Sequence, residues 1–108
     1  MNTIRNSVRL IGRVGNAPEV KTFDNGNKVA SFPLATNEYF YNDKGEKQEQ
    51  TQWHSIVAWG KNAEVVERFA EKGKELAVAG RINYNSYQDK DGVKRTNTEI
   101  VINELLLL

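Results

Sequence analysis

The residues of this chain that could do chemistry are mainly aromatic and cationic. Residues 51–61 hold both tryptophans, Trp53 and Trp59, together with His54, the only histidine. Single-stranded nucleic acid is typically held by aromatic side chains, on which bases stack, and by a cationic groove that contacts the phosphates. The two tryptophans therefore indicate a flat aromatic surface for a flat ligand, unless their face is also buried.

Other aromatic and basic residues extend this candidate surface. Phe40 and Tyr41 begin a polar stretch, and Tyr84 and Tyr87 lie in a later β-favouring segment. Tyr84 and Tyr87 differ in strand parity, so only one fits a given face of an unbent strand, and Tyr87 is favoured because it shares its parity with Arg81. The predicted phosphate contacts are Arg5, Arg9, Arg13, Lys21, Lys61, Lys72 and Arg81.

Catalytic chemistry has little support in the sequence. The chain has no cysteine to pair with His54, and no serine stands in a nucleophile-elbow pattern. The carboxylates fall in turns or beside lysines, as solvated surface charges do, and no spacing resembles a metal cluster. A metal-dependent nuclease would need several convergent carboxylates. The chain is therefore predicted not to be an enzyme and to bind no cofactor or metal.

The segment that must position the tryptophans is predicted to be a strand, because its middle is apolar and β-favouring. Alternation puts Trp53, Ser55, Val57 and Trp59 on one face and His54, Ile56 and Ala58 on the other. Since Ile56 and Ala58 are apolar and are expected to face the core, both indoles, on the opposite face of the strand, are predicted to lie at the surface. The phenylalanines predicted to lie in the core are Phe23, Phe32 and Phe69.

The remaining elements predict a small barrel. Strands are expected over residues 6–14, 19–23, 28–37, 75–87 and 93–106, with a helix that begins at Asn62 as N-cap and stops at Gly73. Gly12 and Gly80 interrupt strands and indicate bulges or bends. Residues 38–49 are expected to form a projecting hairpin or a flexible loop. This order predicts one domain over residues 1–108, an all-β OB-fold: a five-stranded Greek-key barrel with a helix between strands 3 and 4. A β-sandwich is the main alternative.

Composition bounds the class of protein. The chain has 108 residues, a net charge of +1 and no cysteine, which fits one small domain in a reducing compartment. No apolar run approaches the length of a membrane span and no signal peptide is evident, so a cytoplasmic protein that does not enter membranes is expected. Basic residues gather in the first third, although on charge alone a solvated surface is the simpler interpretation.

Several motifs, in order along nearly the whole chain, resemble the bacterial single-stranded DNA-binding protein family. That family is itself a standard example of sequence-tolerant single-strand binding. The matching segments are VRLIGRVG (8–15), APEV (17–20), ASFPLATN (30–37), QWH (52–54), WGK (59–61), KG (72–73), VAGR (78–81) and QDKDG (88–92).

The resemblance implies a homotetramer of OB-folds that wraps single-stranded DNA in replication, recombination and repair. It implies that His54 lies at a subunit interface. Tryptophan is common in the family where Phe40 and Tyr87 stand, and phenylalanine where Trp59 stands, so a stacking face is kept at each. The residues that the resemblance assigns to base stacking are Phe40, Trp53, Trp59 and Tyr87.

Two departures from the family pattern carry expectations. Ser55, Asn83 and Asn85 are neutral where the family is often basic, so fewer phosphate contacts and a shallower salt dependence are expected. The family usually continues into a flexible linker and an acidic tip, whereas this sequence ends in four leucines, so tail-mediated protein partners are not expected from this chain. Two other functions stay open: a dimeric primosome-type relative, and an interaction module with little nucleic-acid binding.

Overall fold

The computed structural model describes residues 4–108 and contains six strands and one helix in that range. The strands are β1 (Val8–Val14), β2 (Glu19–Thr22), β3 (Lys28–Tyr41), β4 (Lys47–Trp59), β5 (Glu75–Gln88) and β6 (Lys94–Leu107), and helix α1 (Lys61–Phe69) connects β4 to β5. None of the residues 4–108 belongs to a helix that is long and apolar enough to cross a membrane.

The sheet closes on itself to form a barrel. Its strand order is β1-β5-β6-β4-β3-β2, and a further pairing of β1 with β3 completes the circle. β1 pairs with β5 from Val8 to Arg13 and with β3 at Arg13 and Val14. The pairing of β4 with β6 is parallel and short, limited to the rows of Ile56 and Val57. Five strands therefore form the barrel, with β2 as an added edge strand and α1 after the third barrel strand, which confirms the predicted OB-fold.

Gly12 and Gly80 lie where two backbones approach too closely for any side chain. A Cβ on Gly12 would lie 2.2 Å from the carbonyl oxygen of Ala35, and one on Gly80 would lie 2.1 Å from that of Val101. Gly12 stands where β1 passes from β5 to β3, and Gly80 stands at a register shift between β5 and β6. The two glycines predicted from the sequence to mark bends therefore lie at the bend and the irregularity that close the barrel.

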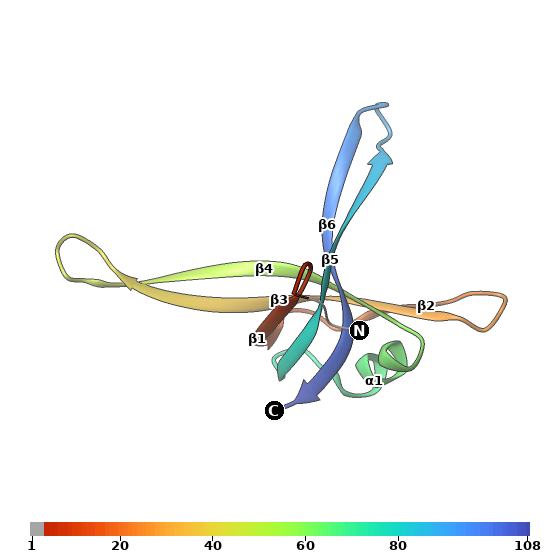
Figure 1. The fold of residues 1–108 in the computed structure, drawn as a ribbon, viewed down its shortest axis with the longest axis horizontal. Coiled ribbons are helices and arrows are strands. Elements are labelled where there is room, and N and C mark those ends of the chain that lie inside the picture. Colours follow the sequence, from red (N-terminus) through yellow and green to blue (C-terminus); the bar gives the residue numbers. More distant parts are fainter. Residues whose placement is uncertain (1–3) are drawn as a thin grey trace.

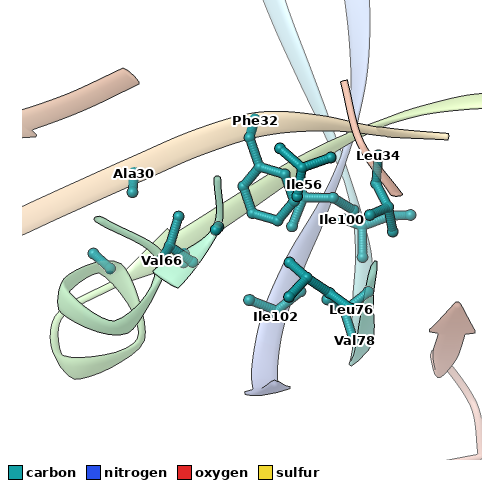
Figure 2. Close-up of a cluster of buried hydrophobic side chains, with 13 residues drawn as sticks. Ala30, Phe32, Leu34, Ile56, Val66, Leu76, Val78, Ile100 and Ile102 are labelled. Atoms are coloured by element: carbon teal, nitrogen blue, oxygen red, sulfur yellow. The ribbon is translucent and has the colours of Figure 1, made fainter. Parts of the chain in front are cut away.

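The barrel interior is apolar and is covered at one end by the helix. Phe32, Leu34, Ile56, Leu76 and Ile100 meet there from four different strands (Figure 2). α1 adds its own buried residues Ala63 and Val66 to this core. No side chain of a polar or charged residue in the described range is buried, so the hydrophobic effect is the main force that holds the barrel closed.

The helix corrects three predictions. Its end is not at Gly73: the last helical residue is Phe69, and the C-cap is Ala70. Asn62 is not the N-cap: α1 starts at Lys61, and the capping position is Gly60, with φ 61° and no side-chain cap. A left-handed φ suits glycine, so the chain turns from β4 into α1 without an Asn cap. Phe69 is not a core residue, because it is 42% exposed at the last position of the helix. Phe23 is only half-buried and lies outside the core cluster, whereas Phe32 is buried as predicted.

Three hairpins project from the barrel. In Figure 1 the β3–β4 hairpin extends to the left, the β5–β6 hairpin upward and the β2–β3 hairpin to the right. The residues at 38–49, predicted as a hairpin or a loop, form the paired end of the β3–β4 hairpin, which stays in register to Tyr41 and Lys47. The three tips turn at Gly26, Gly45 and Gly92, each with a positive φ, as the turn motifs predicted.

Candidate nucleic-acid interface

The two tryptophans lie on the outer face of β4. Ile56 and Ala58 are fully buried, whereas Trp53 is 62% and Trp59 is 49% exposed. The unbroken register with β3 pairs Trp53 with Ala35 and Trp59 with Val29, so both indoles share one face of the β3–β4 sheet. The prediction that the indoles lie at the surface is confirmed. Val57, between them on that parity, is nevertheless buried.

Each indole is supported on one side by the protein. A Cβ on Gly15 would lie 2.4 Å from the Trp53 ring and 3.4 Å from the ring of Pro33, so the indole lies against bare backbone at that glycine. Trp59 stacks on Phe23, with ring centroids 6.1 Å apart and planes inclined by 11°. Rings held in this way are fixed in orientation yet keep exposed surface, which is what a stacking platform requires.

Lys21 brings positive charge to the Trp59 platform. Its ammonium lies 5.1 Å from the centroid of the Phe23 ring, the same ring that supports Trp59. The register of β2, β3 and β4 places Lys21, Val29 and Trp59 in one row across the sheet. Among the predicted phosphate contacts on β2, β3 and β4, Lys21 is therefore the residue that lies next to a predicted stacking residue, Trp59.

The β3–β4 hairpin carries aromatic residues on both of its faces. Phe40 is exposed, but the register puts it on the parity of Leu34 and His54, opposite to Trp53. Tyr39 and Tyr41 share the parity of Trp53, and the Lys47 ammonium lies 4.4 Å from the Tyr39 ring centroid. The sequence reasoning did not include Tyr39. The parity that links it to Trp53 is apparent only once the strand register is known.

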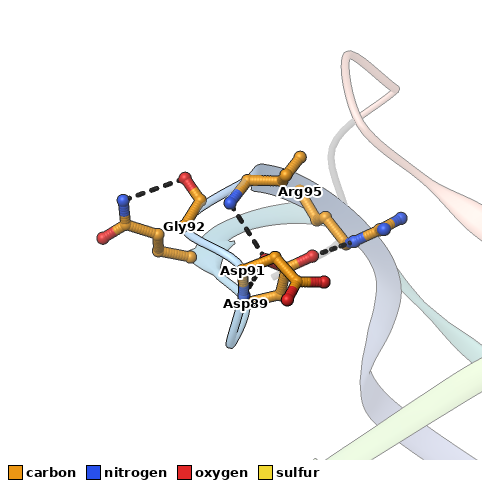
Figure 3. Close-up of polar contacts among 6 residues, drawn as sticks. Asp89, Asp91, Gly92 and Arg95 are labelled. Atoms are coloured by element: carbon orange, nitrogen blue, oxygen red, sulfur yellow. Dashed lines mark hydrogen bonds and ion pairs between the residues drawn. The ribbon is translucent and has the colours of Figure 1, made fainter.

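The β5–β6 hairpin presents Tyr87 beside a fixed arginine. Tyr87 pairs with Arg95 across the strands, and the Arg95 Nε donates to Asp89 Oδ2 at 2.6 Å (Figure 3). The Asp89 Oδ1 accepts the backbone N–H groups of Asp91 and Val93. The Arg95 guanidinium, together with these N–H groups, holds the pKa of Asp89 below its ordinary value. Arg95 is thus a cation beside a predicted stacking residue, and the sequence did not single it out because only the register brings it beside Tyr87.

The other predicted phosphate contacts are exposed but spread over the molecule. Arg5 precedes β1, Lys61 opens α1, Lys72 follows the helix, and Arg81 lies on β5 opposite Val101. Arg9 and Arg13 lie on the outer parity of β1. Arg13 donates to the Gly73 carbonyl at 3.1 Å.

Arg9 lines a separate, mainly apolar cleft of about 660 Å³ with Ile11 and Leu106. The structure thus does not gather the seven predicted cations into one groove.

His54 of β4 contacts the neighbouring strand β3. It is half-buried, and its Nε2 lies within hydrogen-bond distance, 2.9 Å, of the Thr36 Oγ1. Within residues 4–108 no group of three or more His, Cys, Asp or Glu is placed to hold a metal ion.

Comparisons with known proteins point to one family. The sequence model of the single-strand binding protein family matches residues 5–108. The chain is 42% identical over 104 residues to single-stranded DNA-binding protein 1 of Chlorobaculum tepidum, which covers 95% of this chain and 64% of that protein. It is 44% identical over 105 residues to the single-stranded DNA-binding protein of Bacteroides thetaiotaomicron, with 95% of this chain and 65% of that protein covered.

The chain thus spans somewhat less than two thirds of the length of these curated relatives. Among solved structures, a Plasmodium falciparum SSB complex with ssDNA superposes with a TM-score of 0.87 at 33% identity, and the match covers 100% of this chain and 97% of that chain.

Proposed function

The chain belongs to the single-strand binding protein family, and we propose that it binds single-stranded DNA without requiring a particular sequence. Bases stack on exposed aromatic rings, and lysines and arginines contact phosphates. The observation that carries this proposal is the pair of half-exposed indoles, Trp53 and Trp59, each supported on one side and both on one face of β4. Stacking tolerates every base because every base has a π-face.

The stacking set is Phe40, Trp53, Trp59 and Tyr87. Because Phe40 lies on the opposite parity of the β3–β4 hairpin from Trp53, a strand that stacks on both passes around the edge of that hairpin. Lys21 and Arg81 supply phosphate contacts, and Arg5, Arg13, Lys61 and Lys72 supply further positive charge along the path. Arg9 lines the cleft with Ile11, so in the oligomer it contacts a neighbouring subunit as well as the phosphates.

This binding would protect exposed single strands during replication, recombination and repair, and it needs no catalytic step. The protein would therefore work where the DNA is, in the cytoplasm with the nucleoid.

We further propose that the protein forms a homotetramer. Two apolar side chains on the outside of the barrel support this: Ile11 is 62% and Leu106 is 57% exposed, and both line the 660 Å³ cleft. A small domain with such a patch gains by covering it. In the described structure β1 also has no strand partner on one side from Val8 to Gly12. His54 is assigned to a subunit interface, where its half-buried contact with Thr36 suits a structural role.

A tryptophan-fluorescence titration tests the DNA-binding proposal. Thymine oligonucleotide is added at two salt concentrations, with duplex DNA as the control. Strong quenching by the single strand alone, weaker at higher salt, is expected from stacking on Trp53 or Trp59 together with phosphate contacts. Absence of both quenching and binding would contradict the proposal and favour an interaction module instead.

The oligomer is tested by measuring the mass in solution of the unmodified protein and of Ile11→Glu. A tetramer that dissociates in the variant, without loss of strand content by circular dichroism, is the expected result, because a charge on this face would be costly to bury. A dimer in the unmodified protein would contradict the tetramer and point to a primosome-type arrangement.

A further inference from the structure

A cleft lined by both polar and apolar residues lies on the outer face of the barrel, between the strand positions of the two tryptophans. Its volume is about 300 Å³, and its walls come from β3 and β4, from β6, and from β2 with the loop before it. Ser55 and Val57 form part of its floor, and these two residues separate Trp53 from Trp59 on the outer face of β4. A nucleic-acid strand that follows the two indoles therefore passes over this cleft.

The strand register places polar side chains on both sides of the cleft. Glu19 pairs with Ser31 on the β2 side. On the other side, Asn97 and Glu99 belong to β6, whose Ile100 is paired with Ile56 of β4. Glu99 directly precedes Ile100 on β6, and Ser55 directly precedes Ile56 on β4. Because the two strands are parallel, Glu99 and Ser55 therefore lie at the same level.

Glu99 is held in place by two amides from β5. The Nδ2 groups of Asn85 and Asn83 both donate to its Oε1, the Asn83 contact at 3.5 Å. The residue is half-buried. Among residues 4–108 no hydrogen bond reaches Glu99 Oε2, the Ser55 hydroxyl or the Asn97 amide. The cleft thus offers a carboxylate that is already oriented, beside polar side-chain groups that have no hydrogen-bond partner within the described part of the chain.

The charge of the cleft selects which part of a nucleotide can enter. Glu19 and Glu99 are both acidic and line it without any lysine or arginine among the lining residues. A phosphate would be repelled there, whereas a base edge that presents N–H donors would be attracted. A carboxylate is a good acceptor for the exocyclic amino group of cytosine.

We propose that this cleft seats the edge of a nucleobase and that Glu99 accepts a hydrogen bond from an exocyclic amino group on it. The inference rests on the proposed single-strand binding and adds a base preference at one position of the path. Cytosine, adenine and guanine carry such a group, whereas thymine has none, and its N3–H lies between two carbonyl oxygens, which a carboxylate repels. Asn83 and Asn85 act as positioning residues because they hold the carboxylate.

The test compares the affinities for oligo-dC and oligo-dT of equal length at one salt concentration, measured by fluorescence anisotropy of the labelled strand. The variants are Glu99→Gln, Asn97→Ala and, as a charge-matched control outside the cleft, Glu71→Gln. In E99Q the affinity for oligo-dC relative to oligo-dT is expected to fall about fivefold, because a charge-assisted hydrogen bond becomes a neutral one. In N97A the ratio is expected to fall in the same direction, and in E71Q it should stay as in the unmodified protein.

The outcomes separate the two proposals. If both oligonucleotides bind and the ratio in E99Q and N97A equals that in E71Q, the cleft does not read a base edge, and the single-strand binding stands. If the unmodified protein binds neither oligonucleotide, the proposed function itself is wrong. Should E99Q fail to fold, N97A still decides, since Asn97 is exposed and makes no side-chain hydrogen bond among the described residues.

Discussion

Replacing Trp53 with alanine should weaken single-strand binding far more than it weakens the fold. Trp53 is 62% exposed, so about two fifths of its surface, roughly 75 Å², is covered by the protein; at about 25 cal/mol per Å² this corresponds to about 2 kcal/mol of folding stability. A small domain typically has about 5–15 kcal/mol, so the variant should fold. The lost base stack is worth about 1–3 kcal/mol, a range established on single-strand binders of this kind, and raises the Kd roughly 5- to 150-fold.

The assay is anisotropy of a labelled thymine oligonucleotide, which does not depend on the fluorescence of the tryptophan that is removed. Trp53→Phe keeps an aromatic face against Gly15 and should bind much more tightly than W53A. Phe69→Ala is the matched control, since Phe69 is 42% exposed at the end of α1, outside the face of the indoles. An affinity of W53A within about twofold of the unmodified protein, with unchanged circular dichroism and mass, would refute the assignment of Trp53 to base stacking.

Three further changes probe the turn, the barrel closure and the charges. Gly12→Ala would place a Cβ 2.2 Å from a backbone oxygen and should lower the free energy of unfolding in a denaturant titration by a few kcal/mol, on the order of an overpacked core; equal stability would contradict the close approach. Asp89 has a pKa below its ordinary value of 3.8. Its ionised form therefore stabilises the fold at pH values above 3.8, and this stabilisation is lost as the pH falls through the folded-state pKa. Asp89→Asn should therefore show a smaller drop in Tm on acidification below about pH 4, and an identical drop would contradict this reasoning. Lys21→Ala should reduce the slope of log K against log salt for single strands by about 0.7, the value for one phosphate contact, and an unchanged slope would remove Lys21 from the interface.

The β-strand pattern and the apolar alternation of the sequence were enough to predict the barrel. Ile56 and Ala58 alternate with Trp53 and Trp59, and only one parity of a half-buried strand can face a core. Gly12 and Gly80 were recognisable as bends because a strand interior otherwise disfavours glycine. These are local constraints on single strands, and the structure agrees with them at all of these residues.

The errors arose where a local signal competes with tertiary packing. Asn62 has the chemistry of a cap, but Gly60 already turns the chain by a positive φ, so α1 starts two residues earlier than a cap at Asn62 would allow. Phe69 has the spacing of a core residue, but the helix ends there, and Ala63 and Val66 are the helix residues that reach the barrel.

For the candidate site, too, one part could be predicted from the sequence and another part depends on the tertiary structure. Residue types alone were enough to predict that this chain offers rings for stacking and cations for phosphate contacts. Only the tertiary structure decided which of them meet: that Phe23 supports Trp59, that Phe40 and Trp53 occupy opposite parities of one hairpin, and that Glu99 stands beside Ser55. The reason is that alternation is a property of one strand, whereas neighbours across a sheet depend on register, which is set by turns, bulges and barrel closure between residues far apart in the chain.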